Sequence, residues 1–108
     1  MAEYIFLRPV YFTDMCIMFG RRPTDLSYTF VLQALSACGV GISETTSGHM
    51  LRYPVDGQDV TIALHRDHHK AETIPRLTVI KIRNSMRRRW GWSRDTFRVV
   101  GDEDNGDD

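Results

Sequence analysis

The stretch Thr45-Thr46-Ser47-Gly48-His49-Met50-Leu51 decides the fold, because it predicts a tight turn between two strands. Residues 42–46 are rich in β-branched side chains and contain no proline, which predicts a short strand. Ser47-Gly48 predicts a two-residue turn, since glycine takes positive φ at no steric cost. A second strand follows over residues 50–55. We therefore expect His49 directly after the turn, beside the sheet edge.

A second hairpin signal follows the first. Asp56-Gly57 is a dipeptide typical of tight hairpin turns. Apolar residues then alternate with smaller or more polar ones over 59–64, which predicts a third strand with one apolar face. Residues 65–75 are predicted to form a polar loop. The centre of the chain is thus expected to form three antiparallel strands.

A helix is predicted before these strands and another after them. The first has Thr24 as N-cap and Asp25 in its first turn, and it ends at Gly39 or Gly41. Its apolar stripe consists of Leu26, Phe30, Ala34, Leu35 and Cys38. Residues 78–82 are β-branched enough for a strand. However, Val79, Ile82, Met86 and Trp90 follow one another at helical spacings, and Gly91 suits a C-cap after Arg87, Arg88 and Arg89.

The resulting order predicts an α+β fold in which a three-stranded antiparallel sheet packs against two helices. An extra element precedes this α-β-β-β-α domain. Residues 4–12 are apolar enough for a strand, which Pro9 would restrict to a sheet edge, while residues 14–19 fit either a helix or a strand. We divide the chain into an N-terminal extension (1–22), the domain (23–100) and an acidic disordered tail (101–108).

Charge and composition favour a cytoplasmic protein with a polyanionic partner. The 108 residues include 14 acidic and 14 basic ones, but five of the acids lie in the tail. The body therefore carries nine acidic residues against 14 basic ones, a net charge of +5. No apolar run approaches the ~20 residues of a membrane span, and no basic segment marks a signal peptide. Cys16 and Cys38 fit no metal or disulfide pattern and are expected to be reduced core residues.

The order of elements and four short motifs resemble the HicA family of toxins, whose fold is like that of the double-stranded-RNA-binding domain. The matching pieces are Leu35-Ser36-Ala37-Cys38-Gly39, Ser47-Gly48-His49, Leu64-His65, and Trp90-Gly91-Trp92-Ser93 with Phe97. The resemblance covers residues 25–97. Two departures from the family pattern are the exchange of Gly and Ser before His49 and the Leu that replaces Pro before His65.

The resemblance implies a metal-independent endoribonuclease, or mRNA interferase, that needs no cofactor and is neutralised by a HicB-like antitoxin. His49 would be its catalytic base, because an imidazole titrates near working pH and the RNA 2′-OH supplies the nucleophile. Scattered cations suffice to hold RNA, which is recognised mainly by shape and phosphates. The residues expected to bind it are Arg52, His65, Lys70, Arg76, Arg87 and Arg88.

Other interpretations of these residues stay open. His49 also fits a surface histidine, and the cations fit a solvated helix face or sheet position. The cluster His65, His68 and His69 lacks the spacing of a zinc site. Trp90 and Trp92 fit a helix end packed on the core better than a base-stacking platform. A catalytically inactive nucleic-acid-binding module and an interaction subunit with an exposed apolar N-terminal segment are the alternative functions.

Overall fold

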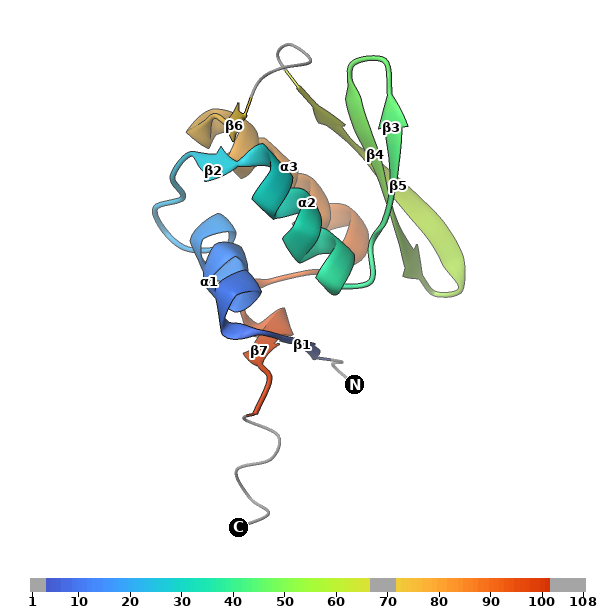
Figure 1. Cartoon of the computed structure of the whole chain (residues 1–108). Coiled ribbons are helices and arrows are strands. Elements are labelled where there is room, and N and C mark those ends of the chain that lie inside the picture. The colour runs from blue at the N-terminus through green and yellow to red at the C-terminus, as the bar shows by residue number, and fades with distance from the viewer. Residues whose placement is uncertain (1–3, 67–71, 102–108) are drawn as a thin grey trace.

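The computed structural model describes residues 4–66 and 72–101 and has the predicted α+β architecture (Figure 1). Its elements, in chain order, are β1 (Ile5–Leu7), α1 (Pro9–Met18), β2 (Leu26–Ser27), α2 (Tyr28–Ala37), β3 (Gly41–Thr45), β4 (Gly48–Val55), β5 (Gln58–His65), β6 (Thr73–Ile74), α3 (Arg76–Trp90), a 3₁₀ turn (Arg94–Thr96) and β7 (Phe97–Val99). The order α2-β3-β4-β5-α3 confirms the predicted domain topology.

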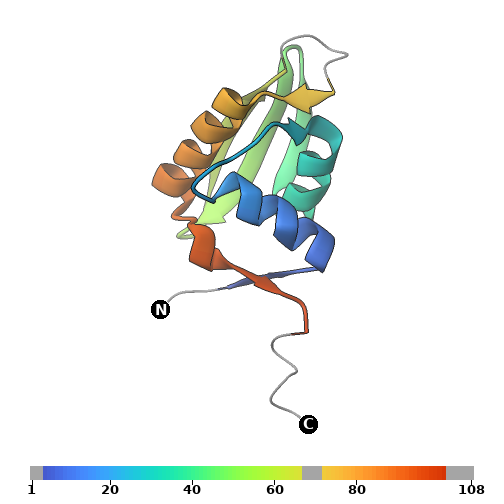
Figure 2. The same ribbon diagram turned by 90° about the vertical axis from the view of Figure 1, so that its left-hand side faces the viewer.

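The antiparallel sheet has the order β3-β4-β5, so β4 is its central strand. Helices α2 and α3 cover one face of the sheet (Figure 2). Leu51 pairs with Ile62 and points to these helices, as its complete burial shows. At the far end of the sheet Asp56 and Gly57 both have positive φ, 52° and 82°, which confirms the second predicted turn.

The first turn lies one residue earlier than predicted. Thr45 pairs with Gly48, so Thr46 and Ser47 form the loop and Gly48 begins β4. Neither loop residue has a positive φ. Gly48 is needed for a different reason, which is the close approach of β5. A Cβ atom there would overlap the carbonyl oxygen of Leu64 and lie 3.0 Å from the backbone nitrogen of Arg66.

Helix α2 begins later than predicted, and its N-cap is Ser27 rather than Thr24. The Ser27 hydroxyl accepts a hydrogen bond of 3.2 Å from the backbone N–H of Phe30. Ser27 and its neighbour Leu26 are held as β2, antiparallel to β6, which also corrects the predicted loop over residues 65–75. The buried face of the helix carries Tyr28, Val31, Ala34 and Leu35. Phe30, placed in the predicted stripe, is only half-buried.

Helix α3 confirms the helical interpretation of the segment over 78–91. Gly91 has the left-handed φ of 75° that the C-cap requires. At the other end, the N-cap residue Pro75 gives no side-chain hydrogen bond. Asp25 supplies one instead, because its carboxylate accepts a bond of 2.8 Å from the backbone N–H of Arg76. Asp25, which was predicted to lie in the first turn of α2, therefore caps the N-terminus of α3.

The N-terminal segment packs as part of the domain core. β1 runs parallel to β7, so the two ends of the domain lie side by side (Figure 1). Pro9 occupies the first turn of helix α1, where its missing N–H costs nothing, and not a sheet edge as predicted. Met15 and Met18 of this helix are buried. Within the described part of the chain, no helix has the length and apolar character needed to cross a membrane.

Candidate active site

His49 is the second residue of the central strand β4 and points to the helix-covered face of the sheet. It pairs with Leu64 on β5 and with Glu44 on β3. Its side chain shares a face with Leu51, two residues along the strand, because successive side chains alternate. The imidazole is half-buried. It is therefore a side chain at the rim of the core, and not one at the sheet edge.

The imidazole is held by Tyr28, the first residue of α2. The Tyr28 hydroxyl lies 2.9 Å from His49 Nδ1 and 3.3 Å from the carbonyl oxygen of Leu64. Only 1% of Tyr28 is exposed, and the two rings lie 5.4 Å apart. Burial raises the pKa of the Tyr28 hydroxyl, and the charge of Arg66 opposes this rise. The hydroxyl consequently stays protonated and remains a hydrogen-bond donor at neutral pH.

The number of protons at this junction places a proton on Nδ1 of His49. A carbonyl oxygen only accepts, so the single hydroxyl proton of Tyr28 is used in its bond to Leu64. The contact with Nδ1 is then a hydrogen bond only if Nδ1 carries the proton and donates it to the hydroxyl oxygen. Both contacts are satisfied when Nδ1 is protonated and Nε2 bears the lone pair.

Nε2 is not fully enclosed by the described part of the chain. Over residues 4–66 and 72–101 it makes no hydrogen bond, and it is absent from the enclosed polar atoms that lack a partner. A half-buried imidazole with one nitrogen fixed and the other accessible is a competent proton acceptor. The site can therefore take a proton from a group that approaches Nε2.

Arg66 brings a positive charge to this junction. Its guanidinium carbon lies 4.3 Å above the centre of the Tyr28 ring, within cation–π range. Its backbone N–H donates a bond of 2.9 Å to the carbonyl of Ser47 in the first turn. The loop, Tyr28, His49 and Arg66 thus meet at one end of the sheet, with the guanidinium over the ring of the tyrosine that contacts His49.

Two of the residues predicted to bind RNA lie on the other face of the sheet. His65 pairs with Gly48, and Arg52 is three residues beyond His49, so both point away from the helices. Arg52 extends over β3 and lies 3.5 Å from the Ser43 hydroxyl. The structure therefore does not bring Arg52 or His65 together with His49.

Arg76 lies at the same end of the fold as His49, but much of its hydrogen bonding is structural. Its Nε donates to the carbonyl of Pro23 at 2.9 Å, which ties α3 to the segment before β2. Lys70 was predicted to flank this region together with Arg76. Lys70, His68 and His69 all lie outside the described residues.

Arg87 and Arg88 lie towards the opposite end of the sheet. Trp90, two residues beyond Arg88, donates from its indole to the carbonyl of Val60 at 2.9 Å. Val60 is four residues from Leu64, the partner of His49, which corresponds to about 13 Å along β5. Both arginines are exposed, but they form a surface separate from the base.

Sequence reasoning missed Tyr28 and Arg66. Tyr28 lies seven residues before Leu35 and three before Val31, so a helical stripe drawn through these residues would have included it. Arg66 stood inside the histidine-rich segment, in which only the histidines were considered, for metal binding and, at His65, for RNA binding. In the described part of the chain no three histidine, cysteine or acidic residues are close enough to hold a metal ion. No family model, curated protein or solved structure matches the chain.

Proposed function

We propose that this protein is a HicA-like endoribonuclease in which His49 is the general base. The observation that carries the proposal is the bond between His49 Nδ1 and the buried Tyr28 hydroxyl, which leaves Nε2 as the accessible lone pair. The order α2-β3-β4-β5-α3 and the position of a histidine directly after the first turn support the family resemblance.

The reaction needs few groups, because RNA contains its own nucleophile. The 2′-oxygen attacks the adjacent phosphorus while its proton passes to Nε2 of His49. The bond from phosphorus to the 5′-oxygen breaks, and that oxygen leaves after taking a proton. The products are a 2′,3′-cyclic phosphate and a 5′-hydroxyl end. Arg66, beside Tyr28, is suited to neutralise the phosphate. One well-placed acid–base group contributes about 10²–10⁴-fold to such a rate.

The biological setting follows from the same resemblance. The substrate would be mRNA in the cytoplasm, and a HicB-like antitoxin would restrain the enzyme. The accessible side of Nε2 and the exposed turn at residues 46–47 are where an inhibitor would have to bind to block this chemistry.

The test is cleavage of end-labelled RNA by the full chain and by His49→Ala. We expect the variant to lose at least 100-fold in rate. It should retain its fold, because the side chain is half-buried and contributes about one hydrogen bond, or about 1 kcal/mol. Wild-type cleavage by His49→Ala would refute the assignment. Arg52→Ala, on the other face of the sheet, is the matched control and should cleave at a nearly normal rate.

A second measurement examines the chemistry of the ends. Cleavage should survive EDTA and produce cyclic phosphate termini that mass spectrometry can identify. Complete loss in EDTA with recovery in zinc would instead direct attention to the segment from His65 to His69. If RNA binds without any cleavage, the inactive nucleic-acid-binding module becomes the better description.

A further inference from the structure

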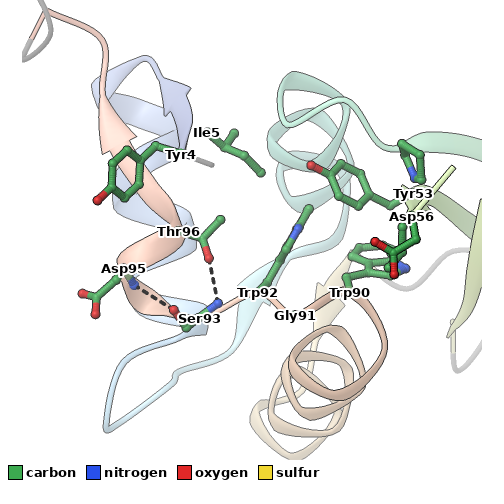
Figure 3. A pocket seen from close by; sticks show the side chains of 12 residues that line it. Tyr4, Ile5, Tyr53, Asp56, Trp90, Gly91, Trp92, Ser93, Asp95 and Thr96 are labelled. Atoms are coloured by element: carbon green, nitrogen blue, oxygen red, sulfur yellow. Dashed lines mark hydrogen bonds between the residues drawn. The ribbon is translucent and has the colours of Figure 1, made fainter. Parts of the chain in front are cut away.

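A groove of about 700 Å³ lies at the end of the sheet remote from His49. Its walls come from β1, from the β4 end near Val55 and from the segment after α3 (Figure 3). Trp92 lies between Tyr4 on one side and Tyr53 on the other (Figure 3). The residues that the following argument uses are Tyr4, Tyr53, Pro54, Asp56, Trp92 and Asp95.

The indole N–H of Trp92 is a hydrogen-bond donor without a partner among the described residues. Only 3% of Trp92 is exposed. Even so, its N–H makes no hydrogen bond within residues 4–66 and 72–101, and it is absent from the enclosed unpaired atoms. The N–H is therefore not fully enclosed, and Trp92 is one of the residues that line the groove. The neighbouring Trp90 differs, since its indole donates to the carbonyl of Val60. A buried donor without a partner is costly unless a ligand or water satisfies it.

The walls of the groove are aromatic and held in place. The rings of Tyr53 and Trp92 pack edge to face, with centres 4.9 Å apart. Tyr4 is 49% exposed, and Pro54, which follows Tyr53 on β4, is exposed as well. Below them, the Ser93 hydroxyl accepts a bond of 3.2 Å from the backbone N–H of Asp95 (Figure 3). This capping interaction fixes the backbone of Asp95, which lines the groove.

The charge of the groove is opposite to that of the rest of the body. Asp56 and Asp95 line it, and no lysine or arginine does. Two carboxylates at the rim disfavour the phosphates of RNA and the acidic C-terminal residues of this chain, while they favour cations. The complementary ligand therefore has basic side chains, an apolar surface for the aromatic rings and a carbonyl oxygen for the indole.

We propose that this groove binds an extended, proline-rich and basic segment of a partner protein. A polyproline II strand has a solvated backbone whose carbonyls are free to accept from Trp92, and its proline rings pack on aromatic walls at low entropic cost. Arginines on the same strand would pair with Asp56 and Asp95. The site is separate from His49, so the inference does not depend on the proposed ribonuclease activity.

The experiment follows the two indole N–H resonances of the full-length ¹⁵N-labelled chain during a peptide titration. The probe is a peptide of repeating Pro-Pro-Arg, and the controls are peptides of repeating Pro-Pro-Glu and Gly-Ser-Arg. We expect a saturable shift of the Trp92 indole while that of Trp90 stays in place. Both control peptides should bind at least tenfold more weakly.

The double variant Asp56→Asn with Asp95→Asn should weaken Pro-Pro-Arg binding several-fold and leave the fold intact, since both carboxylates are exposed. A Trp92 resonance that does not move with Pro-Pro-Arg would overturn the proposal. Equal binding of Pro-Pro-Glu would also overturn it, because the carboxylates would then play no part. A shift of the Trp92 resonance caused by single-stranded RNA would show that the groove takes a different ligand.

Discussion

Asp14 provides a quantitative test of the packing, because its carboxyl lies on the buried face of α1. Only 7% of the residue is exposed, and Oδ2 is enclosed without a hydrogen-bond partner in the described part of the chain. Desolvation by burial raises the pKa of this carboxyl from 3.8 to about 6. The folded protein therefore holds the Asp14 proton more tightly than the unfolded chain does.

The effect on stability follows from this difference. Below about pH 4 both states bind the proton, so Asp14 carries no penalty. As the pH rises through 6 the unfolded chain has already lost the proton while the folded state must ionise a buried group. The free energy of unfolding thus decreases between these values and then levels off. A difference of about two pKa units corresponds to an upper limit of about 3 kcal/mol.

The substitution Asp14→Asn keeps the size of the side chain and removes its charge. We expect the variant to be about 2–3 kcal/mol more stable than the wild type at about pH 7.5 and nearly equal to it at about pH 4. Urea unfolding at several pH values measures the difference. Asp59→Asn, which removes an exposed carboxylate on β5, is the control and should show little effect. A stability difference that is the same at both pH values would refute the reasoning.

Three further predictions concern the region around His49. Tyr28→Phe keeps the ring beneath Arg66 but removes the hydroxyl, so neutral His49 should lose its preference for a protonated Nδ1. The ¹⁵N chemical shifts of the two ring nitrogens measure this preference. An unchanged tautomer would contradict the assignment of the proton to Nδ1. Gly48→Ala should destabilise the fold by about 1–3 kcal/mol in urea unfolding, because the added methyl group overlaps β5; unchanged stability would mean that the strands separate easily. Arg66→Gln should weaken RNA binding and reduce the salt slope by about 0.7 per lost phosphate contact, while the double variant Arg87→Gln with Arg88→Gln should leave cleavage unchanged. If the Arg87/Arg88 double variant reduced the salt slope of RNA binding and Arg66→Gln did not, the RNA would lie along the C-terminal half of α3.

The parts of the fold that were predicted correctly depend on local chemistry. Asp56-Gly57 specifies its own turn, since both residues tolerate the left-handed conformation that a two-residue hairpin needs. Gly91 ends α3 for the same reason. The helical spacing of Val79, Ile82 and Met86 outweighed the β-branching of the same segment, and all three residues are buried. These signals lie within a few residues of the structure that they determine.

The errors arose where a distant segment supplies the partner. Thr24 was predicted to be the N-cap of α2. However, the pairing of β2 with β6 keeps the backbone extended up to Ser27, so the helix begins after Ser27 and this residue is the N-cap. Asp25 caps a helix that begins 51 residues later. Tyr28 contacts His49 across 21 residues, so no local pattern indicates that the tyrosine belongs to the site. His49 itself could be found because its turn is local.

The apolar N-terminal segment illustrates how the structure separates two explanations of one sequence feature. An interaction subunit was predicted to expose a patch over residues 4–19. Instead, the larger part of this apolar surface belongs to the core, where Leu7, Met15 and Phe19 are buried. Tyr4, Phe6 and Val10 stay exposed, and Tyr4 borders the acidic groove. His49 and Val55 are six residues apart on β4, or about 20 Å. A segment bound in the groove would therefore leave Nε2 of His49 open, so partner binding and RNA cleavage can be tested independently on the same chain.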